Sequence, residues 1–285
     1  MVLVTTQQAA GAQFGRAHPI SGGELLRQWR QRRRRSQLDL ALDAGVSARH
    51  LSFVETGRSQ PSRGLLLALA EQLDVPLRER NALLLAAGYA PTYAQSDLDS
   101  AQTQVAREAL EHLLTGHEPY PAVVLDRWGD VVLANRAIGP LLDGVDPGLL
   151  DPPINVYRLS LHPAGLQPRI RNRTEWTAHL GHRLTRLARL TGDPRLADLL
   201  AEVRTYPGVA AVLDDYHEPV TAELLLTLQL SYPDGDLRLH STVTSFGSPH
   251  DVTLAELTIE SFFPADTHTR QLLQCLADAV PAGEQ

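Results

Sequence analysis

One segment constrains the fold of this chain more than any other: it runs from Ser36 to Pro61 and has the sequence SQLDLALDAGVSARHLSFVETGRSQP. Ser36 can begin a helix, because its side-chain oxygen can accept a hydrogen bond from a free amide of the first turn. Gly45 then allows a tight turn, since a residue without Cβ adopts a left-handed backbone at little cost. Ser47 can begin a second helix, which ends at Gly57. The segment therefore predicts two helices joined by a tight turn.

The apolar residues of this segment recur at spacings that bury one side of each helix. They are Leu38, Leu40, Ala41, Val46, Leu51 and Val54. The other side of the second helix then faces outward, as in helices that enter the major groove of DNA. The residues expected on this outer face are Ala48, Arg49, Ser52 and Phe53.

In its capped glycine turn, its outward Arg49 and its closing sequence ETGR, the segment resembles the XRE/Cro family of helix-turn-helix repressors. The resemblance extends over residues 22–90. It implies an all-α bundle of five helices whose third helix contacts operator DNA. Outside the motif we expect a first helix after Ser21, a fourth helix over residues 63–73 and a fifth over residues 77–87.

Charge is distributed unevenly along the chain. The net charge is −7, yet residues 16–63 hold ten arginines and four acidic residues, so this part carries +6 and residues 64–285 carry −13. A basic segment beside an acidic body indicates that DNA contact is confined to one end of the chain.

Candidate DNA contacts follow from the motif. The resemblance implies that Gln37 lies near a phosphate, beside the partial positive charge of a helix N-terminus. Arg49 is the best candidate for reading a base, because a guanidinium can donate to both O6 and N7 of guanine, although it could also contact phosphate or solvent. Phe53 could cover a thymine methyl or pack beneath the following loop. The remaining candidates are Arg34, Arg35, Ser47, Ala48, Ser52, Arg58 and Arg63.

Glu55 is an exception on this basic surface. A carboxylate so close to DNA would be repelled by the phosphates, so we expect it to form an ion pair with an arginine of the first or second helix.

The sequence predicts two domains. We expect a flexible arm at 1–20, the helix-turn-helix domain at 21–92, a linker at 93–104 and a second domain at 105–285. In the second domain, short apolar runs at 122–125, 131–134, 223–232, 237–245 and 252–262 predict strands, and helices are expected at 135–142, 174–190 and 193–205. This order predicts an α+β fold, an antiparallel sheet with helices on one face, like that of a PAS-like sensor domain.

Three sequences in the second domain support a more specific interpretation. YPAVVLDRWGDVVLANRA, NVYRLSLHPAGLQPRI and LAELTIESFFPAD resemble the ligand-binding domain of MmyB-like transcription regulators, over residues 105–275. The resemblance implies an apolar pocket for a fatty-acid-like or similar small ligand.

A pocket of this kind needs aliphatic walls and a few polar groups. As polar anchors for a carboxylate we consider Arg158 and His162, one helical turn apart, and Arg169. The alternative is that these three residues attach a proline-rich loop to the sheet. The candidate walls are Leu125, Leu133, Leu226, Leu228 and Leu239.

Several classes of function lack a sequence signal. The single cysteine, Cys275, permits no internal disulfide and suits the cytoplasm. No membrane span, catalytic motif, metal site or cofactor site is expected, and the absence of lysine excludes lysine-dependent chemistry. We therefore predict a homodimeric transcription regulator that binds a palindromic operator. Two alternatives remain: a C-terminal protein-interaction module without a ligand, and an enzyme with an autoregulatory DNA-binding head.

Overall fold

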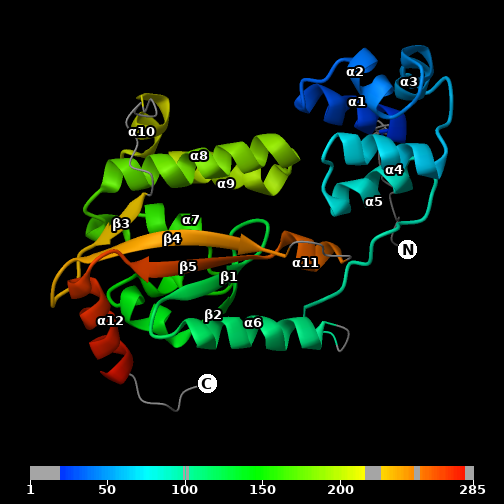
Figure 1. Ribbon diagram of the computed structural model, residues 1–285. Coiled ribbons are helices and arrows are strands. Elements are labelled where there is room, and N and C mark those ends of the chain that lie inside the picture. Colours follow the sequence, from blue (N-terminus) through cyan, green and yellow to red (C-terminus); the bar gives the residue numbers. More distant parts are fainter. Residues whose placement is uncertain (1–19, 99, 101–102, 216–225, 247–250, 280–285) are drawn as a thin grey trace, which may run out of the picture. The chain divides into compact units, whose positions relative to one another are not determined.

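The computed structural model describes residues 20–98, 100, 103–215, 226–246 and 251–279. The chain divides into two compact units, one of residues 1–75 and 79–92 and the other of residues 76–78 and 93–285 (Figure 1). Nearly all of the expected arm lies outside the described residues. No helix in the described part is long and apolar enough to cross a membrane.

The N-terminal part contains five helices. They are α1 (Gly22–Arg32), α2 (Gln37–Asp43), α3 (Ala48–Glu55), α4 (Arg63–Gln72) and α5 (Leu77–Ala86). A serine caps each of the first four, and its hydroxyl accepts a hydrogen bond from an amide of the first turn. The turn between α2 and α3 contains Gly45, whose φ of +67° is in the left-handed region that glycine favours. The predicted five-helix bundle is confirmed.

The core of the first unit lies between α1, α2, α3 and α4. Leu26 and Trp29 of α1 pack with Leu40 of α2 and Leu51 of α3, and each of these side chains is buried. Leu38 was expected in this core, but the structure leaves it 59% exposed. The prediction was wrong because the spacing of apolar residues does not decide which side of α2 faces the core. The structure turns Leu40 and Ala41 inward instead of Leu38.

The second unit is built on a five-stranded antiparallel sheet in the order β2-β1-β5-β4-β3. Its strands are β1 (Ala122–Leu125), β2 (Val131–Ala134), β3 (Thr227–Leu230), β4 (Leu237–Ser245) and β5 (Thr258–Pro264). The register pairs Val123 with Glu260 and Leu228 with Leu239. The first three residues of the range expected for β3, 223–225, lie outside the described residues.

Helices cover both faces of this sheet (Figure 1). On one face, α6 (Gln104–His117) packs through Leu110 and Leu114 against Ala122 and Val124. The opposite face carries the main core and its helices. The prediction of helices on one face was therefore wrong. Successive residues of β1 point to opposite faces of the sheet, and all four are buried, so both faces need covering side chains. The remaining helices are α7 (Val156–Leu161), α8 (Arg173–Thr191), α9 (Pro194–Arg204), α10 (Val209–Asp215), α11 (Val252–Glu256) and α12 (Thr267–Ala279), with short 3-10 helices η1 (Arg136–Leu142), η2 (Pro147–Leu149) and η3 (Gln167–Arg169).

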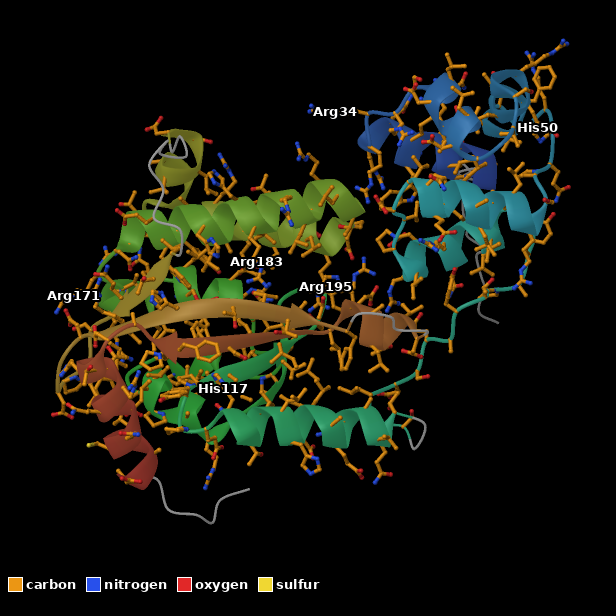
Figure 2. All side chains as sticks on the ribbon, in the orientation of Figure 1. Arg34, His50, His117, Arg171, Arg183 and Arg195 are labelled. Atoms are coloured by element: carbon orange, nitrogen blue, oxygen red, sulfur yellow. The ribbon has the colours of Figure 1, made fainter. Side chains whose placement is uncertain are left out.

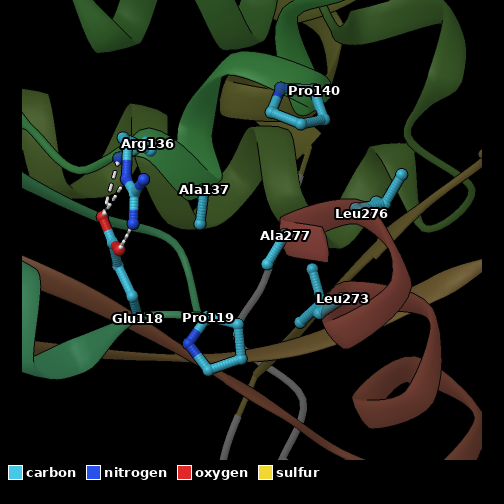
Figure 3. A pocket seen from close by; sticks show the side chains of 8 residues that line it. All are labelled: Glu118, Pro119, Arg136, Ala137, Pro140, Leu273, Leu276 and Ala277. Carbon is cyan, nitrogen blue, oxygen red and sulfur yellow. Dashed lines mark hydrogen bonds and ion pairs between the residues drawn. The ribbon is translucent and has the colours of Figure 1, made fainter. Parts of the chain in front are cut away.

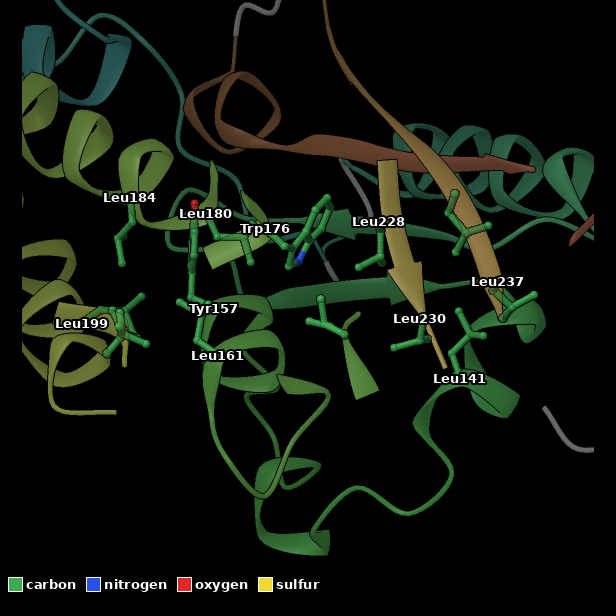
Figure 4. Close-up of a cluster of buried hydrophobic side chains, with 14 of the residues drawn as sticks. Leu141, Tyr157, Leu161, Trp176, Leu180, Leu184, Leu199, Leu228, Leu230 and Leu237 are labelled. Atoms are coloured by element: carbon green, nitrogen blue, oxygen red, sulfur yellow. The ribbon is translucent and has the colours of Figure 1, made fainter. Parts of the chain in front are cut away.

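The main core joins the sheet to α7, α8 and α9 (Figure 4). Tyr157 and Leu161 of α7 pack in one cluster with Trp176 and Leu180 of α8 and with Leu228 of β3. These large side chains fill the space between the helices and the sheet, as close-packed protein interiors do.

Two local expectations need correction. The apolar run 252–262 was expected to be one strand, but Asp251 caps the short helix α11 by accepting hydrogen bonds from Thr253 and Leu254 amides, and β5 follows. The helix expected over residues 135–142 is the 3-10 helix η1, and the side chain of Asn135 does not cap it. This side chain instead accepts a hydrogen bond from the Ala122 amide at 3.0 Å and donates to the Tyr120 carbonyl at 2.8 Å.

The described residues of the segment expected as a linker, 93–104, make contacts within the second unit. The Ser96 amide donates to Asp251 Oδ2 at 3.0 Å, and the Thr253 hydroxyl donates to the Ser96 carbonyl at 2.6 Å. Leu98 is buried against Leu110 and Leu114 in the same cluster.

Candidate DNA interface and ligand domain

Helix α3 presents the outer face expected of a recognition helix. Its inner residues Leu51 and Val54 are buried in the core. Arg49 is exposed, and its guanidinium lies 5.4 Å from the ring centre of Phe53, one turn later on the same side. Ser52 is half-buried. The exposed guanidinium of Arg49 thus lies over the ring of Phe53 on the outer face of α3.

Glu55 forms a buried ion pair beneath this face. Arg30 of α1 binds it with two hydrogen bonds, Nε to Oε1 at 2.6 Å and Nη2 to Oε2 at 2.8 Å. The Glu55 side chain is fully buried and that of Arg30 is 11% exposed. The hydrogen bond to Glu55 raises the pKa of Arg30. The predicted structural role of Glu55 is confirmed.

Gln37 belongs to the same network. Its amide nitrogen donates to Glu55 Oε2 at 2.8 Å, so the side chain at the first position of α2 is held against the end of α3. One carboxylate therefore connects three helices and fixes the angle between α2 and α3. A fixed angle is what a rigid helix-turn-helix needs to place its second helix in a groove.

Other predicted DNA residues have partners inside the first unit. Arg35 forms an ion pair with Asp43 of α2, and Arg63 donates to Thr92 Oγ1 at 2.8 Å. The Ser47 hydroxyl caps α3 by accepting from the His50 amide at 3.1 Å. Ala48 was expected to face outward, but it is half-buried and packs against the core. Ala48 is the first residue of α3, and it is half-buried because it packs against the core that contains the buried residues of α2.

Two further candidates, Arg34 and Arg58, are exposed near the motif. Arg34 follows α1 with a φ of +53° and projects from its end (Figure 2). Arg58 is exposed, and its amide donates to the Phe53 carbonyl at 2.8 Å. Exposed arginines beside a recognition helix are the side-chain type that contacts phosphates, and such contacts hold register without specifying sequence.

Arg33 has a role that the sequence did not indicate. Its side chain donates to the Leu73 carbonyl at 2.8 Å and to the Asp74 carbonyl at 2.9 Å, at the C-terminal end of α4. Nothing in a run of four arginines distinguishes the one that binds these carbonyls.

In the second unit, the predicted polar anchors are engaged by protein groups. Arg158 binds Glu202 of α9 with two hydrogen bonds of 2.7 Å each, and Tyr206 donates to the same carboxylate at 2.6 Å. His162 lies edge-on to Tyr206, with ring centres 4.8 Å apart. Arg169 donates to the Leu141 carbonyl at 2.9 Å and the Asp143 carbonyl at 2.8 Å. Arg158 and Arg169 are therefore bonded to protein groups, although the partner of Arg158 lies on α9 and not on the sheet that the alternative expected.

The Arg158–Glu202 pair predicts a small, pH-dependent contribution to stability. Each side chain is 38% exposed, so an Arg158→Ala variant is expected to lose about 1 kcal/mol or less at neutral pH. The hydrogen bond from Arg158 holds the pKa of Glu202 below its ordinary value. The contribution is thus present above the ordinary pKa of a glutamate and is lost as the pH falls through the lower, folded value.

Urea denaturation of the wild type and this variant at several pH values measures the difference. The two free energies of unfolding are expected to converge at acidic pH. A difference that persists at the lowest pH, where Glu202 is protonated, would contradict the ion-pair interpretation.

The five candidate wall leucines do not line one cavity. Leu226, Leu228 and Leu239 belong to the main core, whereas Leu133 packs with the α6 cluster on the other face of the sheet. Leu125 is buried in β1. The expectation of a common wall was wrong because neighbouring strands can turn their leucines to opposite faces, which a sequence without tertiary contacts does not show.

A small cavity lies beside α12 (Figure 3). It is lined by Pro119, Ala137, Pro140, Leu273 and Leu276, with the Glu118–Arg136 pair at one side. Its volume of about 20 Å³ accommodates roughly one water molecule, so it cannot hold an acyl chain.

A buried polar group in the second unit escaped the sequence analysis. Glu260 of β5 is buried, accepts from Ser241 at 3.0 Å and pairs with Arg183 of α8 at 3.1 Å. No signal in the sequence links these residues, because the three come from different elements. Among the described residues there is no group of side chains that could hold a metal ion.

A capped helix-turn-helix with an exposed arginine on its second helix, followed by a separate α+β unit, defines a DNA-binding regulator with a second regulatory domain. Comparison with known families agrees in both parts. The helix-turn-helix family matches residues 26–80, and the MmyB-like transcription regulator ligand binding domain matches residues 106–276. The chain therefore belongs to the MmyB-like transcription regulators. A comparison with curated proteins finds no match.

Proposed function

We propose that the protein is a homodimeric regulator that acts in the cytoplasm, binds a two-fold operator through α3, and responds to a small apolar, fatty-acid-like ligand. The observation that supports the DNA part is the exposed Arg49 on a helix that the buried Arg30–Glu55–Gln37 network holds in place. A homodimer would place two such helices about one DNA turn, ~34 Å, apart.

Selection of bound fragments from a random DNA pool tests this proposal. The selected sequences are expected to contain two-fold related half-sites about 10 base pairs apart. Sedimentation of the protein alone and with one operator is expected to show two copies per operator. Single half-sites bound by one copy would refute the homodimer.

Arg49 and Arg58 are expected to differ in their effect on operator binding. An Arg49→Ala variant should bind the operator about tenfold more weakly and tolerate changes at one base pair in each half-site. Arg58→Ala is the matched control: it should weaken binding to all sequences alike and reduce the salt dependence. Fluorescence anisotropy with operator variants at several salt concentrations measures both. Equal loss on all sequences for Arg49→Ala would show that Arg49 contacts only phosphate.

The ligand part of the proposal is supported by the match of residues 106–276 to the family's ligand-binding domain. The strand order β2-β1-β5-β4-β3 also fits a PAS-like sensor domain. In such a regulator the ligand must bind two arrangements of the dimer with different affinity in order to change operator binding.

A second candidate function is a protein-interaction module without a ligand. It is favoured by one observation: large side chains of α7, α8 and β3 fill the space beside the sheet. Native mass spectrometry of the purified protein, followed by denaturing extraction, separates the two. A co-purifying acyl compound supports the sensor, whereas a protein of unliganded mass that binds no added amphiphile supports the module.

A further inference from the structure

The second half of β4 is an open edge of the sheet. β3 pairs with residues 237–240 of β4, whereas β5 pairs on the other side with residues 239–245 (Figure 1). Among the described residues, no strand pairs with residues 241–245 on the side of β3. An open edge of this kind is a template to which another strand can add.

The backbone groups that face this edge belong to odd-numbered residues of β4. The Ala265 amide donates to the Arg238 carbonyl at 2.8 Å, so the even-numbered residues of β4 form the hydrogen-bonded pairs with β5. Successive residues of an antiparallel strand direct their N–H and C=O groups to opposite sides, and the register with β5 is uninterrupted. Ser241, Val243 and Ser245 therefore direct their amides and carbonyls toward the open edge.

The outer edge of β3 shows how the same sheet covers an edge. The side chain of Asn172 donates to the Thr227 carbonyl at 2.7 Å and accepts from the Gln229 amide at 3.0 Å. The Arg171 amide donates to the Gln229 carbonyl at 2.8 Å. Proteins also protect edges with charged residues, proline or bulges. Residues 241–245 contain no charged residue and no proline, and their register with β5 is regular, so the edge itself supplies none of these protections.

The side chains along the open edge suit a second strand. Thr242, Val243, Thr244 and Ser245 are all exposed, and the exposed fraction of Val243 is 51%. Threonine and valine favour β-structure, because their branched side chains pack well against a neighbouring strand. A strand that added here would cover these side chains without burying a charged residue of the edge.

The sequence of the edge reads the same in both directions: residues 241–245 are Ser-Thr-Val-Thr-Ser. When two copies of this strand run antiparallel about a two-fold axis at Val243, each Val243 lies opposite its own copy and each Thr242 lies opposite the partner's Thr244. The three odd-numbered residues then form three hydrogen-bonded pairs, with about six hydrogen bonds, two to a pair. Moving the axis by one residue loses one of these pairs. The edge is therefore complementary to itself in one register.

We propose that two copies of the protein associate through residues 241–245 of β4, antiparallel and centred on Val243, so that their two sheets join into one. A two-fold contact uses the same surface on both copies, which a self-complementary edge provides. This inference rests on the proposed homodimer and specifies its interface in the second unit.

Hydrogen exchange of the full chain tests which amides the partner covers. The protein is diluted through the range in which sedimentation velocity shows the dimer to dissociate. The amides of Val243 and Ser245 are expected to exchange at least about tenfold faster in the monomer, whereas those of Thr242 and Thr244, which are bonded to β5, are expected to change little. Protection of Val243 that survives dissociation would refute the interface, because a segment of the same chain then covers the edge.

A Val243→Lys variant places two like charges opposite each other at the axis. It is expected to raise the dissociation constant of the dimer at least about tenfold. Because Val243 is 51% exposed, the lysine should leave the fold intact. Val105→Lys is the matched control: it makes the same substitution at a valine that is 77% exposed on α6 and should keep the wild-type dissociation constant. Sedimentation equilibrium measures both.

Cysteine cross-linking tests the register without weakening the dimer. The background is Cys275→Ser, which removes the single cysteine of the chain. Val243→Cys is expected to form a disulfide between copies, since opposite Cα atoms of a hydrogen-bonded pair lie about 5.5 Å apart, within the reach of a disulfide. Thr242→Cys alone should not cross-link, because its opposite residue is the partner's Thr244. A mixture of Thr242→Cys and Thr244→Cys proteins should.

The outcomes separate the interface from the homodimer itself. If Val243→Lys leaves the dimer intact, or if Thr242→Cys cross-links as readily as Val243→Cys, the interface is refuted and the homodimer stands. Loss of the dimer in Val105→Lys assigns the contact to α6 and refutes the β4 interface as well. A wild type that is monomeric both free and on its operator refutes the homodimer and the interface together.

Discussion

An Arg30→Ala variant is expected to lose about 3–5 kcal/mol of the free energy of unfolding of the DNA-binding unit. The reason is the burial of its partner: the Glu55 side chain is fully buried, and Arg30 makes two hydrogen bonds to it. Removal of the guanidinium leaves a carboxylate in the protein interior with only Gln37 as a remaining side-chain donor. A loss of this size is a large part of the stability of a small domain, so operator binding should also be lost.

Hydrogen exchange of the amides in residues 22–86, measured in increasing urea, reports this unit separately from the rest of the chain. Arg35→Ala is the matched control. Its ion pair with Asp43 joins side chains that are 34% and 43% exposed, so it should cost less than about 1 kcal/mol. Equal effects of the two variants would contradict the structural role assigned to the buried pair.

A double variant separates stability from recognition. Arg30→Met combined with Glu55→Leu replaces the pair by apolar side chains and is expected to restore most of the stability, as at other buried ion pairs. Gln37 then has no carboxylate to hold it. Operator affinity should therefore remain below that of the wild type even though the unit is folded.

A Gly23→Ala variant is expected to destabilise the same unit by about 3 kcal/mol, at the upper end of the range for overpacking. A Cβ at this position would stand 2.0 Å from the Val54 carbonyl oxygen, so α1 and α3 would have to separate. The obstacle is backbone, which cannot rotate away as a side chain can. The displacement would also move Glu55, the next residue, away from Arg30.

Gly64→Ala is the control for this substitution. Gly64 lies in the first turn of α4, and nothing stands within 4 Å of an added Cβ. Alanine there should stabilise the unit by up to about 1 kcal/mol, because it restricts the unfolded chain and favours helix. Amide hydrogen exchange measured in increasing urea gives the free energy of unfolding of both variants. Wild-type stability of Gly23→Ala would show that α1 and α3 are not in such close contact.

Local signals in the sequence were enough to predict the DNA-binding unit. The serine caps at Ser36 and Ser47 and the left-handed Gly45 depend on residues within one or two turns, so a pattern can reveal them. The pairing of Glu55 with an arginine was also predictable, because a lone carboxylate beside phosphates needs a counter-charge. Which arginine it binds was not predictable, since Arg30 is 25 residues away and one of several.

The candidate ligand site was predicted less well. Arg158 and Arg169 were chosen because a carboxylate needs a cation, yet Glu202 and backbone carbonyls bind them. Trp176 falls within the helix predicted over residues 174–190, but no local pattern distinguished it from its neighbours. Its buried indole nitrogen, which has no hydrogen-bond partner in the described part of the chain, became visible once the neighbours from other elements were known.

The sequence by itself determined the helices of the DNA-binding unit with their caps and turns, the strand segments of the first hairpin, and the family, because each rests on short-range patterns or on contiguous motifs. The tertiary structure alone decided which charges are paired, which face of the sheet each leucine joins, and which buried polar atom lacks a partner. The physical reason is that hydrogen bonding and burial depend on groups that lie far apart along the chain. Periodicity shows that a side chain is turned inward, and only packing shows what it meets there.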